Sequence, residues 1–334
     1  MSASNRNDDL LIRVSRRAMA CEFEVCFPAE PYPHGTELAL ETLDLVDALE
    51  GQLSYFRPTS EITRINLLAA DGPVEVEPGL FELLRLAARL HEETGGAYDI
   101  TSTPLWEAWG FARRAGGVPS ELQVAEARQL VGGRLMELDA AGRTIRFLKP
   151  GVRINLGSVA KGYALDRCGE KLLSSGMADF LLHGGQSSVL GRGKQIPARE
   201  DSRETPWEVG VRHPGHPERR LGTIRLCNRA LGTSGSQFQS FRHEGRRYGH
   251  ILDPRTGQPA EGVLSATVVA PTAALADALS TALFVMGARQ SLDYCRAHPE
   301  IGAVLVCPNP HGGGIEVHTV GLSDEVLTLS PSAA

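Results

Sequence analysis

Apolar residues recur at helical spacing in several stretches of the chain, and each of these stretches predicts an amphipathic helix. In the first, Leu43, Val46 and Leu49 follow the helical period. Ser120 is a candidate N-cap for a later helix, and Gly176 stops another. The predicted helices cover residues 36–53, 78–93, 119–131, 160–175 and 272–287.

Short runs rich in β-branched and aromatic residues predict strands, and Gly and Pro turns separate them. Residues 11–27 alternate in places and predict a strand or a hairpin. The other predicted strands cover residues 144–148, 152–156, 180–182, 207–211, 223–226, 236–243, 264–269, 303–307 and 315–320. Most strands of the second half follow one another without a helix between them. This order predicts an α+β fold of mainly antiparallel sheets with packed helices, and not a βαβ wound sheet.

The length bounds the number of domains. A chain of 334 residues is long enough for one large domain or about two ordinary ones. We expect residues 10–325 to form a single unit; a division into two closely packed subdomains, about 10–150 and 151–325, is the alternative.

Composition and charge are those of a soluble globular protein. Hydrophobic residues make up 42% and charged residues 22%, and the net charge of −6 is spread along the chain. No basic footprint for nucleic acid is present. The six cysteines form no Cys-x-x-Cys pair, which argues against a zinc or thiol redox motif and fits reduced thiols.

No apolar run reaches the roughly 18 residues of a membrane-spanning segment. Residues 1–10 are polar and charged, and they do not resemble a secretion signal. We therefore expect a cytoplasmic protein.

The predicted helix at 272–287 carries a candidate cation site. Asp277 and Thr281 are four residues apart, so both side chains lie on one face of the helix, one turn apart. A carboxylate and a hydroxyl are poor core neighbours, but together they suit a hard divalent cation such as Mg2+. The alternative is a carboxylate on a helix face that meets solvent or an arginine.

Four segments carry a family resemblance in their order and spacing. They are Gly96-Ala-Tyr-Asp-Ile-Thr101, Ile154-Asn-Leu-Gly-Ser-Val-Ala-Lys-Gly-Tyr163, Thr233-Ser-Gly235, and His250-Ile-Leu-Asp-Pro-Arg-Thr-Gly257 with the helix of Asp277. From roughly Met19 to Gly287 the chain resembles the ApbE family of FAD:protein FMN transferases.

The resemblance implies an ApbE-like α+β enzyme that binds FAD, its substrate, with Mg2+. Such an enzyme splits the pyrophosphate of FAD, attaches FMN to a Ser or Thr hydroxyl of an acceptor flavoprotein subunit, and releases AMP. A pyrophosphate needs a hard cation to neutralise the charge that builds on its oxygens, which agrees with the candidate site. Two alternatives stay open: an FAD pyrophosphatase that releases FMN and AMP, and a noncatalytic flavin-binding protein.

Residue roles follow from the same resemblance. Asp277, Thr281 and Ser158 match the family's metal ligands, and His250 and Asp253 match its catalytic turn. The cofactor-binding positions are Met19, Phe56, Ala97, Tyr98, Asp99, Asn155, Lys161, Ser234 and Ile251. Lys161 would supply a mobile cation for the diphosphate or a flavin oxygen.

Local chemistry leaves other interpretations of these positions. An ordinary His pKa near 6.5 suits His250 for taking the proton of the target hydroxyl, but His250 can also cap a strand. Asp253 can orient that imidazole or hold a Pro-Gly turn. For Met19, Phe56 and residues 97–99, core packing or turn formation is the alternative.

Three positions depart from the family pattern. Asn155 and Gln186 stand where relatives usually have Asp, and Ser280 where some have a second Asp. An amide carries no charge and cannot act as a base, so a proton transfer at Asn155 is not expected. A site with less negative charge indicates either a transferase whose site has altered properties or a diverged relative that binds FAD poorly.

Overall fold

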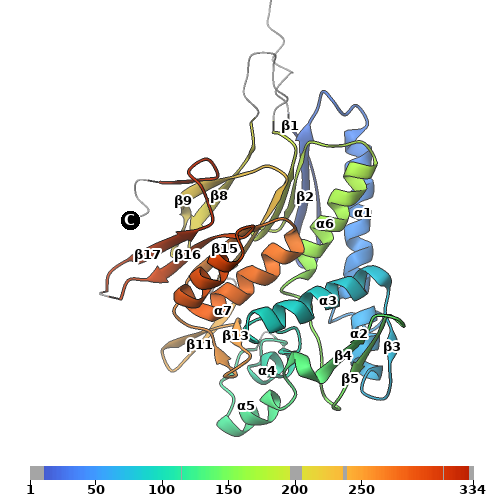
Figure 1. Cartoon of the computed structure of the whole chain (residues 1–334), viewed down its shortest axis with the longest axis vertical. Coiled ribbons are helices and arrows are strands. Elements are labelled where there is room, and N and C mark those ends of the chain that lie inside the picture. Colours follow the sequence, from blue (N-terminus) through green and yellow to red (C-terminus); the bar gives the residue numbers. More distant parts are fainter. Residues whose placement is uncertain (1–10, 114, 196–204, 236–238, 311, 331–334) are drawn as a thin grey trace, which may run out of the picture.

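A computed structural model describes residues 11–113, 115–195, 205–235, 239–310 and 312–330. Its centre is an eight-stranded sheet in which every neighbouring pair is antiparallel, in the order β1-β2-β6-β7-β10-β15-β16-β17 (Figure 1). The strands are β1 (Leu11–Ala18), β2 (Cys21–Pro28), β6 (Phe180–Gly184), β7 (Ser188–Arg192), β10 (Arg229–Gly235), β15 (Ser265–Ala270), β16 (Gly302–Pro308) and β17 (Ile315–Val320).

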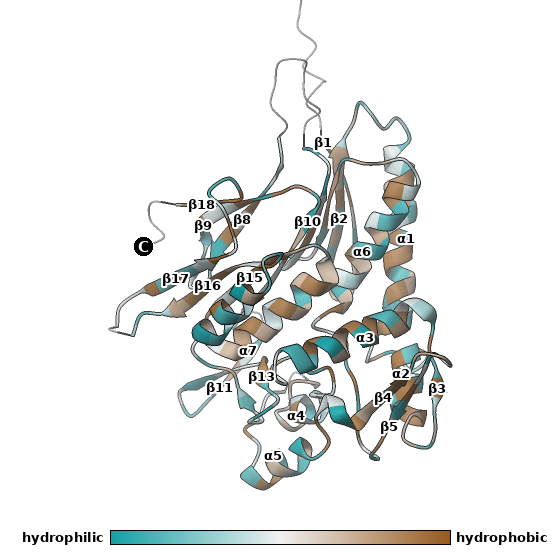
Figure 2. Cartoon of the chain, viewed as in Figure 1, coloured by the Kyte–Doolittle hydropathy of each residue, from teal (hydrophilic) through white to brown (hydrophobic). Residues whose placement is uncertain are grey.

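Helices α1 (Gly35–Leu53), α6 (Ala160–Ser174) and α7 (Ala273–Ala297) lie against one face of this sheet. The other described helices are α2 (Glu61–Leu68), which contacts α1, α3 (Pro78–Glu93), which contacts α7, and the pair α4 (Thr103–Ala108) and α5 (Glu121–Arg128). Helix α7 packs on β10 and β15, and α6 packs between α7 and α1. Figure 2 shows apolar residues concentrated in the strands of the large sheet and along these helices.

Strand alternation divides the sheet into two apolar faces. Val25 and Val268 belong to the core under the helices, whereas their neighbours Cys26 and Val269 belong to a second core. Trp207 fills that second core from a three-stranded sheet of β8 (Trp207–His213), β9 (His216–Leu226) and β18 (Leu327–Leu329). Side chains that alternate in direction along each strand therefore bury both faces of the large sheet.

Smaller sheets complete the fold. One joins β3 (Val74–Glu75), β5 (Thr144–Phe147) and β4 (Met136–Asp139), the last preceded by the short 3-10 turn η1 (Gly133–Leu135). Two hairpins pair β11 (Ser240–His243) with β12 (Arg246–Gly249) and β13 (Leu252–Asp253) with β14 (Gln258–Pro259). In the part of the chain that the structure describes, no helix has both the length and the apolar character that crossing a bilayer requires.

The α+β prediction is confirmed, and so are most of the predicted elements. The predicted strand at 152–156 is wrong, because the side-chain amide of Asn66 satisfies the backbone of Ile154 in place of a strand partner. Helix α7 continues past its predicted end across a kink at Gly287, where φ is 78°. Part of the predicted strand 236–243 lies outside the described residues, as do residues 1–10.

Candidate active site

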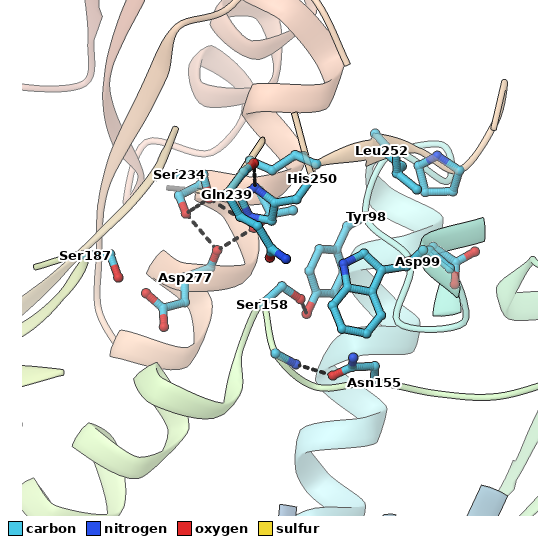
Figure 3. A pocket seen from close by; sticks show the side chains of 18 of the residues that line it. Tyr98, Asp99, Asn155, Ser158, Ser187, Ser234, Gln239, His250, Leu252 and Asp277 are labelled. Atoms are coloured by element: carbon cyan, nitrogen blue, oxygen red, sulfur yellow. Dashed lines mark hydrogen bonds between the residues drawn. The ribbon is translucent and has the colours of Figure 1, made fainter. Parts of the chain in front are cut away.

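A pocket of about 410 Å3 opens where α7, the first turn of α6, the end of β10 and the loop after α3 converge (Figure 3). Figure 3 shows Asp277 on the same side of the pocket as Ser234, with the hydroxyls of Ser158 and Tyr98 hydrogen-bonded to each other near the middle. The described residues that line the pocket are Ala97, Tyr98, Asp99, Ser102, Thr103, Trp106, Asn155, Gly157, Ser158, Lys161, Ser187, Thr233, Ser234, Gly235, Gln239, His250, Ile251, Leu252, Pro254, Asp277, Ser280 and Thr281.

Asp277 is a carboxylate at the bottom of this pocket, and only 6% of it is exposed. Its Oδ2 accepts a hydrogen bond from the backbone N–H of Gly162 at 2.7 Å. The hydroxyl of Ser188, on β7, lies 2.8 Å from Oδ1 and 2.9 Å from Oδ2. Burial raises the pKa of Asp277 to about 6, although Lys161 and these donors act to lower it.

Two glycines allow α7 to bring Asp277 this close to α6 and β10. A Cβ on Gly162 would lie 2.2 Å from the carbonyl oxygen of Ala273. A Cβ on Gly232 would lie 2.5 Å from the carbonyl carbon of Ala276. Because any larger residue would push the backbones apart, both glycines position the carboxylate.

The start of α7 is anchored by a second carboxylate, which is half-buried. Asp166, on α6, accepts hydrogen bonds from Ala273 N at 2.7 Å and Ala274 N at 2.8 Å. These are N–H groups of the first helical turn, which have no partner within the helix. Burial raises the pKa of Asp166 to about 6.

Several hydroxyl groups line the same pocket as Asp277, and those of Ser280 and Thr281 donate to its backbone carbonyl oxygen, at 2.8 and 3.4 Å. Ser234 Oγ lies 2.8 Å from Ser280 Oγ and 3.1 Å from Thr281 Oγ1. Ser158 Oγ donates to the hydroxyl of Tyr98 at 3.3 Å. A carboxylate with neutral oxygen donors is the chemistry of a hard cation and not of zinc.

The donor set also limits how a cation would be held. Among the described residues no group of three His, Cys, Asp or Glu side chains could hold a metal ion. Of the two carboxylates that line the pocket, Asp99 is held by Thr101 and His91, so Asp277 is the candidate charged ligand, and further negative charge would come with the substrate. Mg2+ sites built from one or two carboxylates and substrate phosphates have this composition.

His250 lies in the pocket wall, and a backbone carbonyl determines which nitrogen of its ring carries the proton. Its Nδ1 lies 3.0 Å from the backbone carbonyl oxygen of Gln239. A carbonyl only accepts, so Nδ1 carries the proton of the neutral ring and Nε2 is left as an acceptor. Burial lowers the pKa of His250, so the ring is neutral near pH 7.

Asp253, the other residue of the predicted catalytic turn, does not line this pocket. Its carboxylate accepts from the backbone N–H and from Nε of Arg255, each at 2.9 Å. Of the two interpretations of Asp253, the contacts favour the holding of the turn over the orientation of His250.

Asn155 and Asp99 shape the walls by local hydrogen bonds. Asn155 Oδ1 accepts from Gly157 N at 2.9 Å, which sets the turn that presents Ser158. Asp99 Oδ1 accepts from the backbone N–H and the hydroxyl of Thr101, at 2.7 and 2.6 Å.

Most predicted positions come together in the pocket, but Met19 and Phe56 do not line it. Met19 sits at the β1–β2 turn with φ of 48°, and its side chain packs partly against the core. Phe56 is 68% exposed and lies 6.1 Å, ring centre to ring centre, from Trp106, which does line the pocket. Their contacts with a cofactor stay predictions.

Several residues of the site carried no signal in the sequence. Ser188 meets Asp277 from a position 89 residues away. His91, at the end of α3, lies behind the pocket with Nδ1 3.2 Å from Asp99 Oδ2, and this carboxylate raises the pKa of His91. Trp106 and Ser187 belong to no recognisable motif. Only the fold reveals them.

The chain is similar in sequence and in fold to proteins named flavin transferases. The chain is 32% identical to the FAD:protein FMN transferase of Haemophilus influenzae over 253 residues, 73% of this chain and 71% of that protein. The crystal structure of the ApbE protein of Thermotoga maritima superposes with a TM-score of 0.81 at 30% identity, over 92% of this chain and 96% of that one. The apo flavinyl transferase ApbE of Pseudomonas stutzeri gives a TM-score of 0.82 at 27% identity, over 95% and 97%.

The α+β fold and the pocket with its buried carboxylate, lysine and neutral histidine define the chain as an enzyme. The model of the ApbE family matches residues 19–305, and the chain belongs to that family.

Proposed function

We propose that this enzyme is a Mg2+-dependent FAD:protein FMN transferase. It would attach FMN from FAD to a Ser or Thr hydroxyl of an acceptor protein and release AMP. The observation that carries the proposal is the position of Asp277, which is buried and lines the same pocket as the hydroxyls of Ser234, Ser280 and Thr281. Related proteins named FAD:protein FMN transferase support the activity.

The residues that would hold the cation are Asp277, Thr281 and Ser158. When bound, Mg2+ neutralises charge on the pyrophosphate oxygens and stabilises the departing phosphate. Hydrogen bonds from Ser188 and Gly162 fix the Asp277 carboxylate in one orientation, and a fixed ligand keeps the geometry of such a site.

Lys161 lies in the same pocket and would bind the pyrophosphate as a point charge. Its charge would help to hold the substrate so that the phosphorus of its FMN half faces the incoming hydroxyl.

His250 is the residue suited to move a proton. Its Nε2 would take the proton of the acceptor hydroxyl as the oxygen of that hydroxyl attacks the FMN phosphorus. The new O–P bond replaces the P–O bond to the AMP phosphate, which leaves with the bridging oxygen. The hydrogen bond from Nδ1 to Gln239 supports the ring during this transfer.

The test is a mass measurement. The purified enzyme, FAD, Mg2+ and a candidate acceptor protein should yield an acceptor heavier by one FMN, and one AMP for each modified acceptor. Release of AMP and FMN at the same rate with no acceptor present would instead favour an FAD pyrophosphatase. Bound FAD that stays intact with every acceptor and with Mg2+ would contradict both reactions.

A further inference from the structure

A second cavity, of about 610 Å3, lies beside the candidate active site. It is bounded by β2, by the first turn of α6, by the loop between β6 and β7, and by β8. Its lining residues are Cys21, Glu22, Glu24, Lys161, His183, Gly185, Gln186, Ser187 and Arg212.

The two cavities share a wall. Lys161 and Ser187 line both of them, and the ammonium group of Lys161 donates a hydrogen bond to Ser187. Ser187 Oγ lies 3.5 Å from Ser188 Oγ, which in turn holds Asp277. The second cavity is therefore separated from the candidate cation site by a few polar side chains.

The position of this shared wall bears on the side from which the acceptor hydroxyl would attack the phosphorus. In phosphoryl transfer the attacking and leaving oxygens lie roughly in line on opposite sides of phosphorus. Figure 3 shows Ser187 at one end of the pocket, beyond Asp277 and away from Asp99 and Leu252. If FAD occupies the part of the pocket near Asp99, the part near Ser187 remains open to the acceptor protein.

The lining of the second cavity matches a peptide chain. Arg212 Nη1 donates to Gln186 Oε1 at 2.6 Å, and the remaining N–H groups of both side chains are hydrogen-bond donors. Glu22 and Glu24 alternate along β2, so both carboxylates lie on one face of the strand and offer acceptors. Because each residue of a polypeptide presents a carbonyl and an N–H group, a cavity with donors on one wall and acceptors on another complements its main chain.

Charged and titratable groups next to the cavity do not cancel this arrangement of donors and acceptors. His183 pairs across the strands with Glu24, and burial lowers the pKa of His183, so it adds no fixed charge near pH 7. Arg13 lies 3.8 Å from Glu24 but is 66% exposed, where an ion pair contributes little. Gln186, which departs from the family pattern, lines this cavity and accepts the hydrogen bond from Arg212.

We propose that the second cavity binds the segment of the acceptor protein that carries the target Ser or Thr, with Arg212, Gln186 and Glu22 contacting its main chain. The segment brings its hydroxyl to the wall formed by Lys161 and Ser187. This inference rests on the proposed transferase function. It further assigns to Gln186 and Arg212 a part of the affinity for the acceptor.

The experiment compares Arg212→Ala with the wild-type enzyme on an acceptor protein that the wild type flavinylates. Loss of a hydrogen bond to a charged group should raise KM for the acceptor roughly tenfold. The dissociation constant of FAD should stay unchanged. Gln186→Ala should act in the same direction.

The matched control is Arg219→Ala, which removes an exposed arginine of β9 that does not line the cavity. This variant should keep the wild-type KM for the acceptor. Thermal unfolding of all three variants checks that the fold is intact.

Three results would overturn the inference in distinguishable ways. An unchanged acceptor KM in Arg212→Ala, with flavinylation intact in the wild type, rejects the acceptor site and leaves the transferase function standing. A weaker affinity for FAD in the variant assigns the cavity to FAD. No flavinylation of any acceptor by the wild type rejects both proposals.

Discussion

Replacing Asp277 by Asn should make the protein more stable and less active at the same time. The carboxylate is buried, and without a cation its charge has only Lys161 and a few hydrogen-bond donors nearby. An amide has nearly the same shape, can accept from Gly162 N, and can donate to the Ser188 hydroxyl. The substitution therefore removes a desolvated charge without leaving an unsatisfied group.

The magnitude follows from the pKa of Asp277, which burial raises from its usual 3.8 to about 6. At about 1.4 kcal/mol for each pKa unit, ionisation costs the folded state about 3 kcal/mol at pH 8. The pKa of Asp277 is higher in the folded than in the unfolded state, so the protonated carboxyl group favours folding. This contribution to the free energy of unfolding is fully present below pH 3.8 and is lost as the pH rises through about 6. The advantage of the amide is then about 1 kcal/mol at about pH 4.5 and about 3 kcal/mol at about pH 8.

Urea unfolding without Mg2+ and FAD measures this difference for wild type, Asp277→Asn and the control Asp293→Asn. Asp293 also lies on α7, but its side chain is 64% exposed, so the control should stay within about 0.5 kcal/mol of wild type. With Mg2+ and FAD added, the wild type should gain stability and Asp277→Asn should not. An advantage of Asp277→Asn that does not grow between the two pH values, or a variant less stable than wild type at the higher one, would show that the buried charge of Asp277 does not destabilise the fold.

Four further predictions concern the same site. Ser188→Ala should lower the Mg2+ affinity measured from rates about 10- to 100-fold, because the Asp277 carboxylate loses its fixed orientation; an unchanged affinity would contradict this role. His250→Gln should lower kcat for flavinylation about 100-fold or more while the FAD dissociation constant stays the same, and equal losses in both would point to substrate binding instead. Gly162→Ala should lower the free energy of unfolding by about 1–3 kcal/mol, since the new Cβ meets the Ala273 carbonyl, and a wild-type denaturation midpoint would argue against that contact. Removal of divalent ions with EDTA should stop AMP release and added Mg2+ should restore it, whereas AMP release that continues in EDTA would exclude a metal-dependent reaction.

The sequence predicted the parts of the site that depend on local spacing. Helical periodicity placed Asp277 and Thr281 on one face of α7, and the pocket contains both. The amphipathic pattern also gave α3 its observed bounds, Pro78–Glu93, because a proline starts the helix and a glycine pair follows it.

Contacts between distant segments were not predictable in this way. The pairing of Ser188 with Asp277 and of Asp166 with the start of α7 depends on how α6, α7 and β7 pack, and neither pair has a sequence spacing of its own. Residues 152–156 have the composition of a strand, but the amide of Asn66 takes the place of a partner strand. Tertiary hydrogen bonding there overrides local propensity.

The proposed activity depends on a divalent cation held between Asp277 and the pyrophosphate of FAD. A crystal structure of the enzyme with FAD and Mn2+, with anomalous scattering recorded, would locate that cation. We expect an anomalous peak within about 2.3 Å of oxygens from Asp277 and Thr281 and of a phosphate oxygen of FAD. Clear density for FAD in the pocket, with no peak beside Asp277 at saturating Mn2+, would show that Asp277 does not hold the cation.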